Sequence, residues 1–476
     1  MKTLPLAALV VLCAFALPAR PAALPPPLAT ALEKGQVPED AVAVQVQQLG
    51  SGAPDKRILG HQETLPLNPA SVMKLVTSWA SLEILGPTYT WKTRYTSPAQ
   101  IRDGVLEGDL HIAGGGDPRL SRESLWQTVH RLRALGVRRI RGDVVTDRSL
   151  FRLPPHDPGA FDQRPLRPYN AGADALGIDY GAFSLHMQPQ GGRVLIQADL
   201  LPAGLRLENR ISRSKGRCAD PSAGLQARLA PTGAPMVLEI SGQVAEGCTE
   251  AFDWNLAPLS QAQLFEGLFR TLWQEAGGRL DGHFRNGPAP ADTHLLVEQP
   301  SPPLPEILRD MNKWSNNVIA RTLLATLGSQ GEAPRPDEDS AQAGARRVGE
   351  QLAAAGIPTA GLVIENGAGL SRIERTSAAT LGALLAHAWH GPYMPELMAS
   401  LAIAGRDGTA RRRLADSPSA GRAHVKTGTL NGVRALAGYV LSHKGERYSV
   451  VLLINHPNAD AAREAQDALL EWVAGL

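Results

Sequence analysis

Cysteine and aromatic residues are scarce in this sequence. Only three of its 476 residues are cysteine, and Phe, Trp and Tyr together make up 5%. Cys13 lies in an apolar stretch near the N-terminus, which leaves Cys218 and Cys248 for the rest of the chain. Two cysteines have neither the number nor the spacing of a zinc site. So few aromatic rings also offer little surface for stacking nucleic-acid bases.

An excess of charge of one sign is missing too. The 48 lysines and arginines nearly balance the 46 acidic residues, and the net charge of +2 gives no reason to expect nucleic acid or an anionic membrane as a partner. Beyond the N-terminal stretch, no segment has the roughly 18 apolar residues of a membrane-spanning helix. Gly-x-Ser-x-Gly, His-Glu-x-x-His and Gly-Lys-Ser/Thr motifs are also absent, so we expect no metal and no cofactor.

The N-terminus has the features of a secretory signal. Lys2 precedes an apolar run from Leu4 to Leu17, and small residues follow, which predicts a signal peptide over residues 1–23. We therefore expect an exported, soluble protein. In an oxidising compartment Cys218 and Cys248 would form a disulfide around a loop of about 30 residues, and two buried thiols are the alternative.

The first segment that carries residues suited to catalysis is Ser71–Lys74. Pro69 suits the first turn of a helix, and the apolar run after Lys74 predicts that this helix is buried. One turn after Ser71, the Lys74 amine can reach the serine hydroxyl, as a base beside a nucleophile. About two Ser-x-x-Lys matches are expected by chance, and Ser212–Lys215 is a second match, which we interpret as a solvated loop.

Two further segments carry polar groups suited to a cleft. Helical apolar spacing from Glu306 to Leu327 is interrupted by a polar stretch containing Ser315 and Asn317, which predicts a break or a turn that faces a cleft. A cap or a solvated turn is the alternative reading of that stretch.

The other segment is Lys426-Thr427-Gly428-Thr429, which precedes two predicted strands, 435–441 and 448–455. An ammonium, two hydroxyls and a free strand edge suit a peptide that ends in a carboxylate, with Gly428 letting the ligand backbone lie close. Taken alone, the segment is as well explained by the start of an exposed strand.

The remaining sequence indicates more than one domain, because 476 residues exceed what one hydrophobic core usually serves. Residues 98–290 have short strands and frequent turns, with one helix expected over 121–135. Helices are also expected over 341–355, 376–389 and 458–476. His387 and His390 are interpreted as surface or boundary histidines rather than metal ligands.

The order Ser-x-x-Lys, Ser-x-Asn, Lys-Thr-Gly resembles that of penicillin-binding proteins and related β-lactamases. The chain is similar over nearly its whole mature length to the low-molecular-mass D-alanyl-D-alanine carboxypeptidase/endopeptidase family, peptidase family S13. The segments that carry the resemblance are Pro69–Lys74, Gly114–Pro118, Asp310–Asn317, Glu365–Gly367 and Ala404–Thr409.

The resemblance implies an α/β fold with a penicillin-binding/β-lactamase-like transpeptidase domain, in which an antiparallel sheet lies between helices. That domain would be split, with residues 24–97 and 291–476 forming it and residues 98–290 inserted as two small, mainly β domains. Asn316 departs from the Ser-Asp-Asn of relatives, which we take as minor because only the outer two residues are expected to face the cleft.

The resemblance also implies a serine D,D-peptidase of the periplasm that acts on peptidoglycan peptides and is inhibited by β-lactams. Substrates would be D-Ala-D-Ala termini, D-Ala–meso-diaminopimelate cross-links, or both. The expected residues are Ser71 as nucleophile, Lys74 as base, Ser315 as proton relay, Asn317 as orienting group, and Lys426, Thr427, Gly428 and Thr429 in substrate binding.

The base must be neutral to act, so burial and the charge of Lys426 should lower the pKa of Lys74. Two alternatives stay open. A β-lactamase of class A would need an additional glutamate, and no Glu-x-x-Leu-Asn follows Ser315. A catalytically silent wall-binding module would be expected to have lost Ser71, Lys74 or Lys426, and all three are present.

Overall fold

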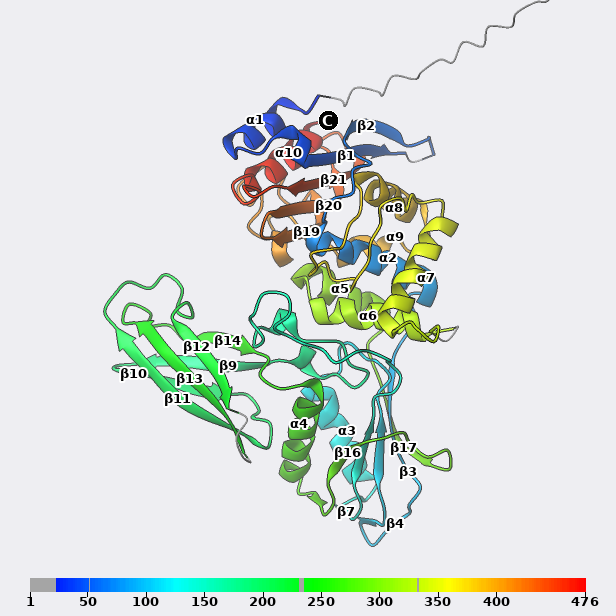
Figure 1. The fold of residues 1–476 in the computed structure, drawn as a ribbon, viewed down its shortest axis with the longest axis vertical. Helices are drawn as coiled ribbons and strands as arrows, with labels where there is room; N and C mark the ends of the chain where they lie inside the picture. Colours follow the sequence, from blue (N-terminus) through cyan, green and yellow to red (C-terminus); the bar gives the residue numbers. More distant parts are fainter. Residues whose placement is uncertain (1–22, 51, 231–234, 332–333) are drawn as a thin grey trace, which may run out of the picture.

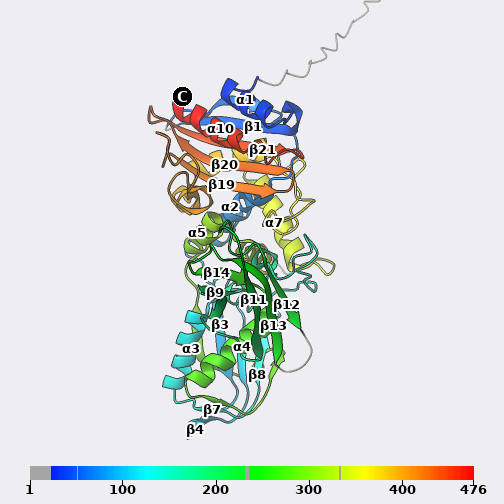
Figure 2. The same cartoon turned by 90° about the vertical axis from the view of Figure 1, so that its left-hand side faces the viewer.

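The computed structural model describes residues 23–50, 52–230, 235–331 and 334–476. The predicted signal peptide, apart from its last residue, lies outside the described residues. Two bodies are stacked along the long axis of the molecule (Figures 1 and 2). Both ends of the described chain, at residues 23 and 476, belong to the body that contains the largest sheet, and the middle of the chain forms the other body.

An antiparallel six-stranded sheet forms the centre of the first body. In order of pairing its strands are β18 (Ala402–Ile403), β19 (Ala423–Leu430), β20 (Val433–Leu441), β21 (Arg447–Asn455), β1 (Val42–Leu49) and β2 (Lys56–His61). The expected strands at residues 435–441 and 448–455 are thus confirmed. The predicted Lys426–Thr429 segment belongs to β19.

Helices cover both faces of this sheet (Figure 1). One face packs against α1 (Pro26–Lys34) and α10 (Arg463–Gly475). On the other face α8 (Ala378–His390) lies against the sheet, and the same core includes α2 (Met73–Leu85), α5 (Leu304–Trp314), α6 (Asn317–Ser329), α7 (Ser340–Ala354) and α9 (Met394–Ser400). Along β21, Val450 and Leu452 belong to the first core while Val451 and Leu453 belong to the second, because successive strand side chains point to opposite faces.

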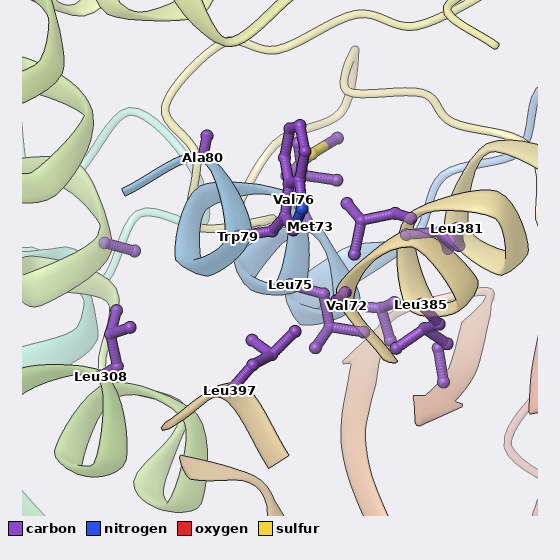
Figure 3. Packing of buried hydrophobic residues seen from close by; sticks show 14 of the residues in the cluster. Val72, Met73, Leu75, Val76, Trp79, Ala80, Leu308, Leu381, Leu385 and Leu397 are labelled. Carbon is purple, nitrogen blue, oxygen red and sulfur yellow. The ribbon is translucent and has the colours of Figure 1, made fainter. Parts of the chain in front are cut away.

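Helix α2 is buried around its whole circumference. Every residue from Met73 to Leu82 is buried, and the helix therefore lies inside the protein rather than on its surface. Figure 3 shows its apolar side chains packed among Leu308 of α5, Leu381 and Leu385 of α8, and Leu397 of α9. The residues before it, Ala70–Val72, form a 3-10 turn, η2, that leads directly into the helix.

The interrupted helical pattern near residue 315 is confirmed as two helices. Helix α5 ends at Trp314, Ser315 adopts a left-handed conformation with φ 58° and ψ 39°, and α6 begins at Asn317. The Asn316 side chain accepts a hydrogen bond from the N–H of Ile319, so it caps α6. Asparagine is a favoured N-cap residue, which gives the departure at Asn316 a structural reason.

The middle of the chain is rich in short strands around one hydrophobic core. A five-stranded sheet contains β16 (Phe284–Asn286), β8 (Val144–Asp147), β6 (Leu110–Ala113), β3 (Lys92–Ser97) and β17 (His294–Pro300). A four-stranded sheet contains β15 (Arg279–Leu280), β7 (Arg139–Ile140), β5 (Val105–Leu106) and β4 (Ile101–Arg102). One three-stranded sheet contains β10 (Arg193–Ala198), β9 (Phe183–Gln190) and β14 (Phe252–Leu256). Another contains β11 (Leu205–Ser214), β13 (Met236–Ala245) and β12 (Leu225–Ala230). Helices α3 (Arg122–Ala134) and α4 (Gln261–Glu275) pack against them.

The division of the chain into domains stays a prediction, but strand pairing favours other boundaries. Strand β3 pairs with β6 on one side and β17 on the other, so boundaries at residues 97 and 291 would cut one sheet. We propose boundaries near Trp91 and Ser301, where the Ser301 N–H donates to the Trp91 carbonyl oxygen. Whether the inserted region is two domains is likewise still a prediction.

Two other expectations in this region have different outcomes. Cys218 and Cys248 form a disulfide, as expected. The loop predicted for Ser212–Lys215 is wrong, because Ser212 and Ser214 lie in β11. Most residues of β11 are exposed or half-buried on both faces, so the strand lacks the apolar alternation that marks a strand in sequence.

The expected fold class is confirmed: an α/β arrangement in which an antiparallel sheet lies between helices, with a mainly β region inserted. Within the described residues, no helix is both long enough and apolar enough to cross a membrane.

Candidate active site

The three predicted segments meet at one pocket. Its volume is about 360 Å³. The residues that line it are Ser71, Ser315, Thr409, Arg413, Thr427, Thr429, Arg434, Arg463 and Gln466. Ser71 comes from η2, Ser315 from the break between α5 and α6, and the two threonines from β19.

Two glycines allow the chain to pack closely around Ser71. A Cβ atom at Gly428 would lie 2.6 Å from the Pro69 carbonyl oxygen and 3.1 Å from the Ser71 nitrogen. At Gly369, where φ is +78°, a Cβ would lie 1.8 Å from the Ala70 carbonyl oxygen. The expected reason for Gly428, room for a ligand backbone, therefore needs correction: the glycine makes room for the turn that carries Ser71.

Lys74 is fully buried and has three oxygen neighbours. Its Nζ lies 3.1 Å from Ser71 Oγ, 2.7 Å from Asn317 Oδ1 and 2.5 Å from the Ala368 carbonyl oxygen. The last two oxygens can only accept hydrogen bonds. A neutral amine would donate its two N–H groups to them, which leaves its lone pair for the Ser71 hydroxyl.

The electrostatic surroundings favour that neutral amine. The pKa of Lys74 lies well below its usual 10.5, first because burial removes water and second because Lys426 is nearby, while Arg321 contributes in the same direction. Glu374 opposes the shift with its negative charge. The direction and both predicted causes are thus confirmed.

Ser315 and Asn317 face different partners across the break between the helices. Lys426 Nζ donates to Ser315 Oγ at 3.0 Å, whereas Asn317 Oδ1 accepts from Lys74. Asn317 Nδ2 donates to the Tyr169 carbonyl oxygen at 3.1 Å, which fixes the orientation of the amide. Because Tyr169 belongs to the inserted region, that region contacts a residue that holds the Lys74 amine.

Strand β19 carries the remaining predicted residues, of which Thr427 and Thr429 line the pocket. Lys426 is fully buried, and its ammonium also donates to the Thr427 carbonyl oxygen at 2.8 Å. Burial lowers the pKa of Lys426 from 10.5 to about 7. The Thr427 and Thr409 hydroxyls lie 3.0 Å apart, and Arg434 Nη1 donates to Thr429 Oγ1 at 2.5 Å.

Several residues of the site were missed in the sequence. Glu374 is completely buried, and its Oε1 accepts the backbone N–H groups of Glu365, Asn366 and Gly367. It thereby holds the loop whose Ala368 carbonyl oxygen contacts Lys74. Burial raises the pKa of Glu374, and these backbone N–H groups oppose that shift. No local motif signals such a contact between a side chain and a distant backbone loop.

Arg434 was missed although a signal for it exists. Asn431 and Gly432 form a two-residue connection between β19 and β20, and Asn-Gly is the preferred sequence for such a hairpin turn. That turn places Thr429 opposite Arg434 in the strand pairing.

A larger cavity, of about 660 Å³, is lined by residues of the loop that holds Lys74, including Glu365, Asn366 and Arg372. Ser71 and Ser315 are not among its lining residues but do line the smaller pocket, so we place the chemistry in the smaller pocket.

The histidines of α8 have other partners. The ring of His387 packs edge-on against Trp79, and His390 Nε2 lies 2.9 Å from Asp55 Oδ1. Among the residues that the structure describes, no three His, Cys, Asp or Glu side chains are grouped so that they could hold a metal ion.

Comparison with known proteins yields one consistent family. The model of the D-Ala-D-Ala carboxypeptidase 3 (S13) family matches residues 25–476. A D-alanyl-D-alanine carboxypeptidase from an Actinomadura species is 30% identical over 421 residues, which cover 85% of this chain and 76% of that protein.

Solved structures agree with this match. The crystal structure of penicillin-binding protein 4 from Haemophilus influenzae has a TM-score of 0.74 at 25% identity, over 93% of this chain and 99% of that one. A complex of the Haemophilus protein with a β-lactam has a TM-score of 0.70 at 23% identity, over the same shares of the two chains. The chain therefore belongs to the D-Ala-D-Ala carboxypeptidase 3 (S13) family and is a serine-type D,D-peptidase of peptidoglycan.

Proposed function

We propose that this protein cleaves D-Ala-D-Ala termini, D-Ala–meso-diaminopimelate cross-links, or both, through an acyl-enzyme formed on Ser71. The observation that carries the proposal is the Lys74 amine, which lies 3.1 Å from the Ser71 hydroxyl while its other two neighbours are hydrogen-bond acceptors. A serine hydroxyl is a weak nucleophile until a base removes its proton.

In the proposed acylation step, Lys74 takes the hydroxyl proton as Ser71 Oγ attacks the carbonyl carbon of the penultimate D-alanine. The backbone N–H groups of Ser71 and Thr429 would stabilise the oxyanion that develops, and one such donor typically contributes about 3 kcal/mol. The C–N bond then breaks, the leaving amine receives a proton by way of Ser315, and an ester to Ser71 remains. Water hydrolyses this ester and regenerates the serine.

Binding of the C-terminal carboxylate is assigned to β19. Thr427 and Thr429 line the pocket together with Ser71, and the Lys426 ammonium donates to the Thr427 carbonyl oxygen. The Lys426 ammonium also donates to Ser315 Oγ, and in this proposal that hydrogen bond orients the Ser315 hydroxyl toward the leaving group. Asn317 holds the Lys74 amine in place.

Inhibition by β-lactams follows from the same chemistry, because the strained amide of a β-lactam presents a carbonyl and a neighbouring carboxylate. The Haemophilus relative forms a complex with a β-lactam. We further propose that the apolar N-terminal stretch directs export and that the protein acts in the periplasm, where peptidoglycan peptides are its partners.

Release of D-alanine from a peptide ending in D-Ala-D-Ala tests this function. The wild-type protein should release D-alanine, and Ser71→Ala should abolish release. The matched control is Ser212→Ala, because Ser212 has the same Ser-x-x-Lys spacing but lies on β11 of the inserted region. Unchanged release by Ser71→Ala would refute the assignment.

A further inference from the structure

Three arginines and one glutamine line the pocket beyond Thr429. We call them the arginine subsite: Arg413, Arg434, Arg463 and Gln466. We propose that the arginine subsite binds a second carboxylate, carried by the amino acid that leaves when the peptide bond is cleaved. This inference rests on the proposed function, since it concerns the substrate of the same site.

The wall of the arginine subsite carries positive charge that its own partners offset only in part. Arg434 Nη2 lies 3.0 Å from Asp460 and Arg413 Nη1 lies 2.5 Å from Asp467. Neither aspartate lines the pocket, and no acidic residue is among those that do. Arg463 has no ion-pair partner within the described part of the chain, so one arginine charge is uncompensated.

Hydrogen-bond donors of the subsite are also unused. The Nε atoms of Arg413 and Arg434 and the Nε2 atom of Gln466 are buried without a hydrogen-bond partner among the described residues. Arg413 and Gln466 are only 8% and 2% exposed. These three atoms have almost no accessible surface, so a ligand in the pocket would meet the exposed Arg463 guanidinium rather than these donors.

The position of the subsite identifies which part of the substrate it meets. Arg434 Nη1 donates to Thr429 Oγ1, and Thr429 is assigned to the carboxylate of the leaving amino acid. The subsite thus lies on the leaving side of the scissile bond. A D-amino acid with a second carboxylate can meet it there, whereas D-alanine has only the first. Carboxylates fit because arginine binds them through paired, charge-assisted hydrogen bonds.

The experiment compares two peptides that differ only at the leaving residue, D-Ala-D-Glu and the isosteric neutral D-Ala-D-Gln, with D-Ala-D-Ala as reference. The ratio of kcat/KM for D-Glu over D-Gln should be at least about tenfold in the wild-type protein, as for one charge-assisted hydrogen bond. Arg463→Gln should reduce that ratio at least about threefold. Arg463 is an exposed residue at the start of α10, so its replacement should leave folding intact, which thermal unfolding checks.

The matched control is Arg412→Gln, an exposed arginine that does not line the pocket and should keep the wild-type ratio. If the protein releases D-alanine but does not prefer D-Glu to D-Gln, the subsite is refuted and the proposed function stands. An equal reduction of the ratio by both variants would also refute the subsite. If no peptide is cleaved, the proposed function and the subsite fall together.

Discussion

Replacing the buried lysine of β19 should stabilise the fold while it destroys the function. The pKa of Lys426 falls from 10.5 to about 7 through burial, and at 1.36 kcal/mol for each pH unit this difference corresponds to about 4 kcal/mol at pH 7. Lys426→Met removes that cost. It also removes hydrogen bonds to Ser315 Oγ and to the Thr427 carbonyl oxygen, each worth about 1 kcal/mol. We therefore expect a net gain of about 2 kcal/mol at pH 7.

The sign of the pH dependence follows from the lowered pKa. Between about pH 7 and pH 10.5 the unfolded chain binds a proton at Lys426 that the folded protein does not, so wild-type stability rises with pH in this window. The advantage of Lys426→Met should therefore shrink with rising pH, disappear at about pH 8.5 and become a disadvantage of about 2 kcal/mol by about pH 10.5, where only the lost hydrogen bonds remain.

Urea unfolding of both proteins at pH 7 and pH 10 measures the effect, with penicillin labelling as the test of function. Lys444→Met, at an exposed lysine of the β20–β21 turn, is the control and should show no such pH dependence. A variant less stable than the wild type at pH 7, or a difference independent of pH, would refute the reasoning.

Three further outcomes are expected. Gly428→Ala should lower the free energy of unfolding by about 1–3 kcal/mol and the rate of penicillin acylation about a hundredfold, because the added methyl group would press on the turn that carries Ser71. The control is Gly349→Ala, where an added Cβ has no atom within 4 Å, so neither quantity should fall. Equal effects of the two substitutions would contradict this packing. Lys74→Ala should keep the fold but lose penicillin acylation. Because the pKa of Lys74 is lowered, the acylation rate of the wild-type protein should level off well below pH 10.5. A rate that keeps rising tenfold per pH unit up to pH 10.5 would indicate a lysine with an ordinary pKa. Reduction of the disulfide between Cys218 and Cys248, 30 residues apart, should lower the free energy of unfolding by about 3 to 4 kcal/mol, and unchanged urea unfolding would count against that stabilisation.

The residues that carry chemistry could be predicted from sequence because each motif brings its own reactive groups. Ser71 and Lys74 are neighbours along one helical turn, so their contact follows from local geometry. The contact between Ser315 and Lys426 does not follow from local geometry, because 111 residues separate them in the sequence. Only the resemblance to a known family predicted that contact, and the structure bears it out.

What could not be predicted depends on contacts between segments far apart in sequence. Glu374 acts on Lys74 through a backbone loop, and the Tyr169 carbonyl oxygen reaches Asn317 from the inserted region. Backbone atoms carry no sequence signature, so these contacts were missed. The pairing of β3 with β17, across almost 200 residues, is a contact of the same kind, and it is the reason why we propose boundaries other than residues 97 and 291.

Mapping the site of penicillin labelling tests the central claim most directly. Wild-type protein is labelled, digested with a protease, and its labelled peptide is sequenced by mass spectrometry. The account predicts a single label, on Ser71, in the peptide that also contains Lys74 or ends there. A label on Ser212, on Ser315 or on any other residue would contradict it.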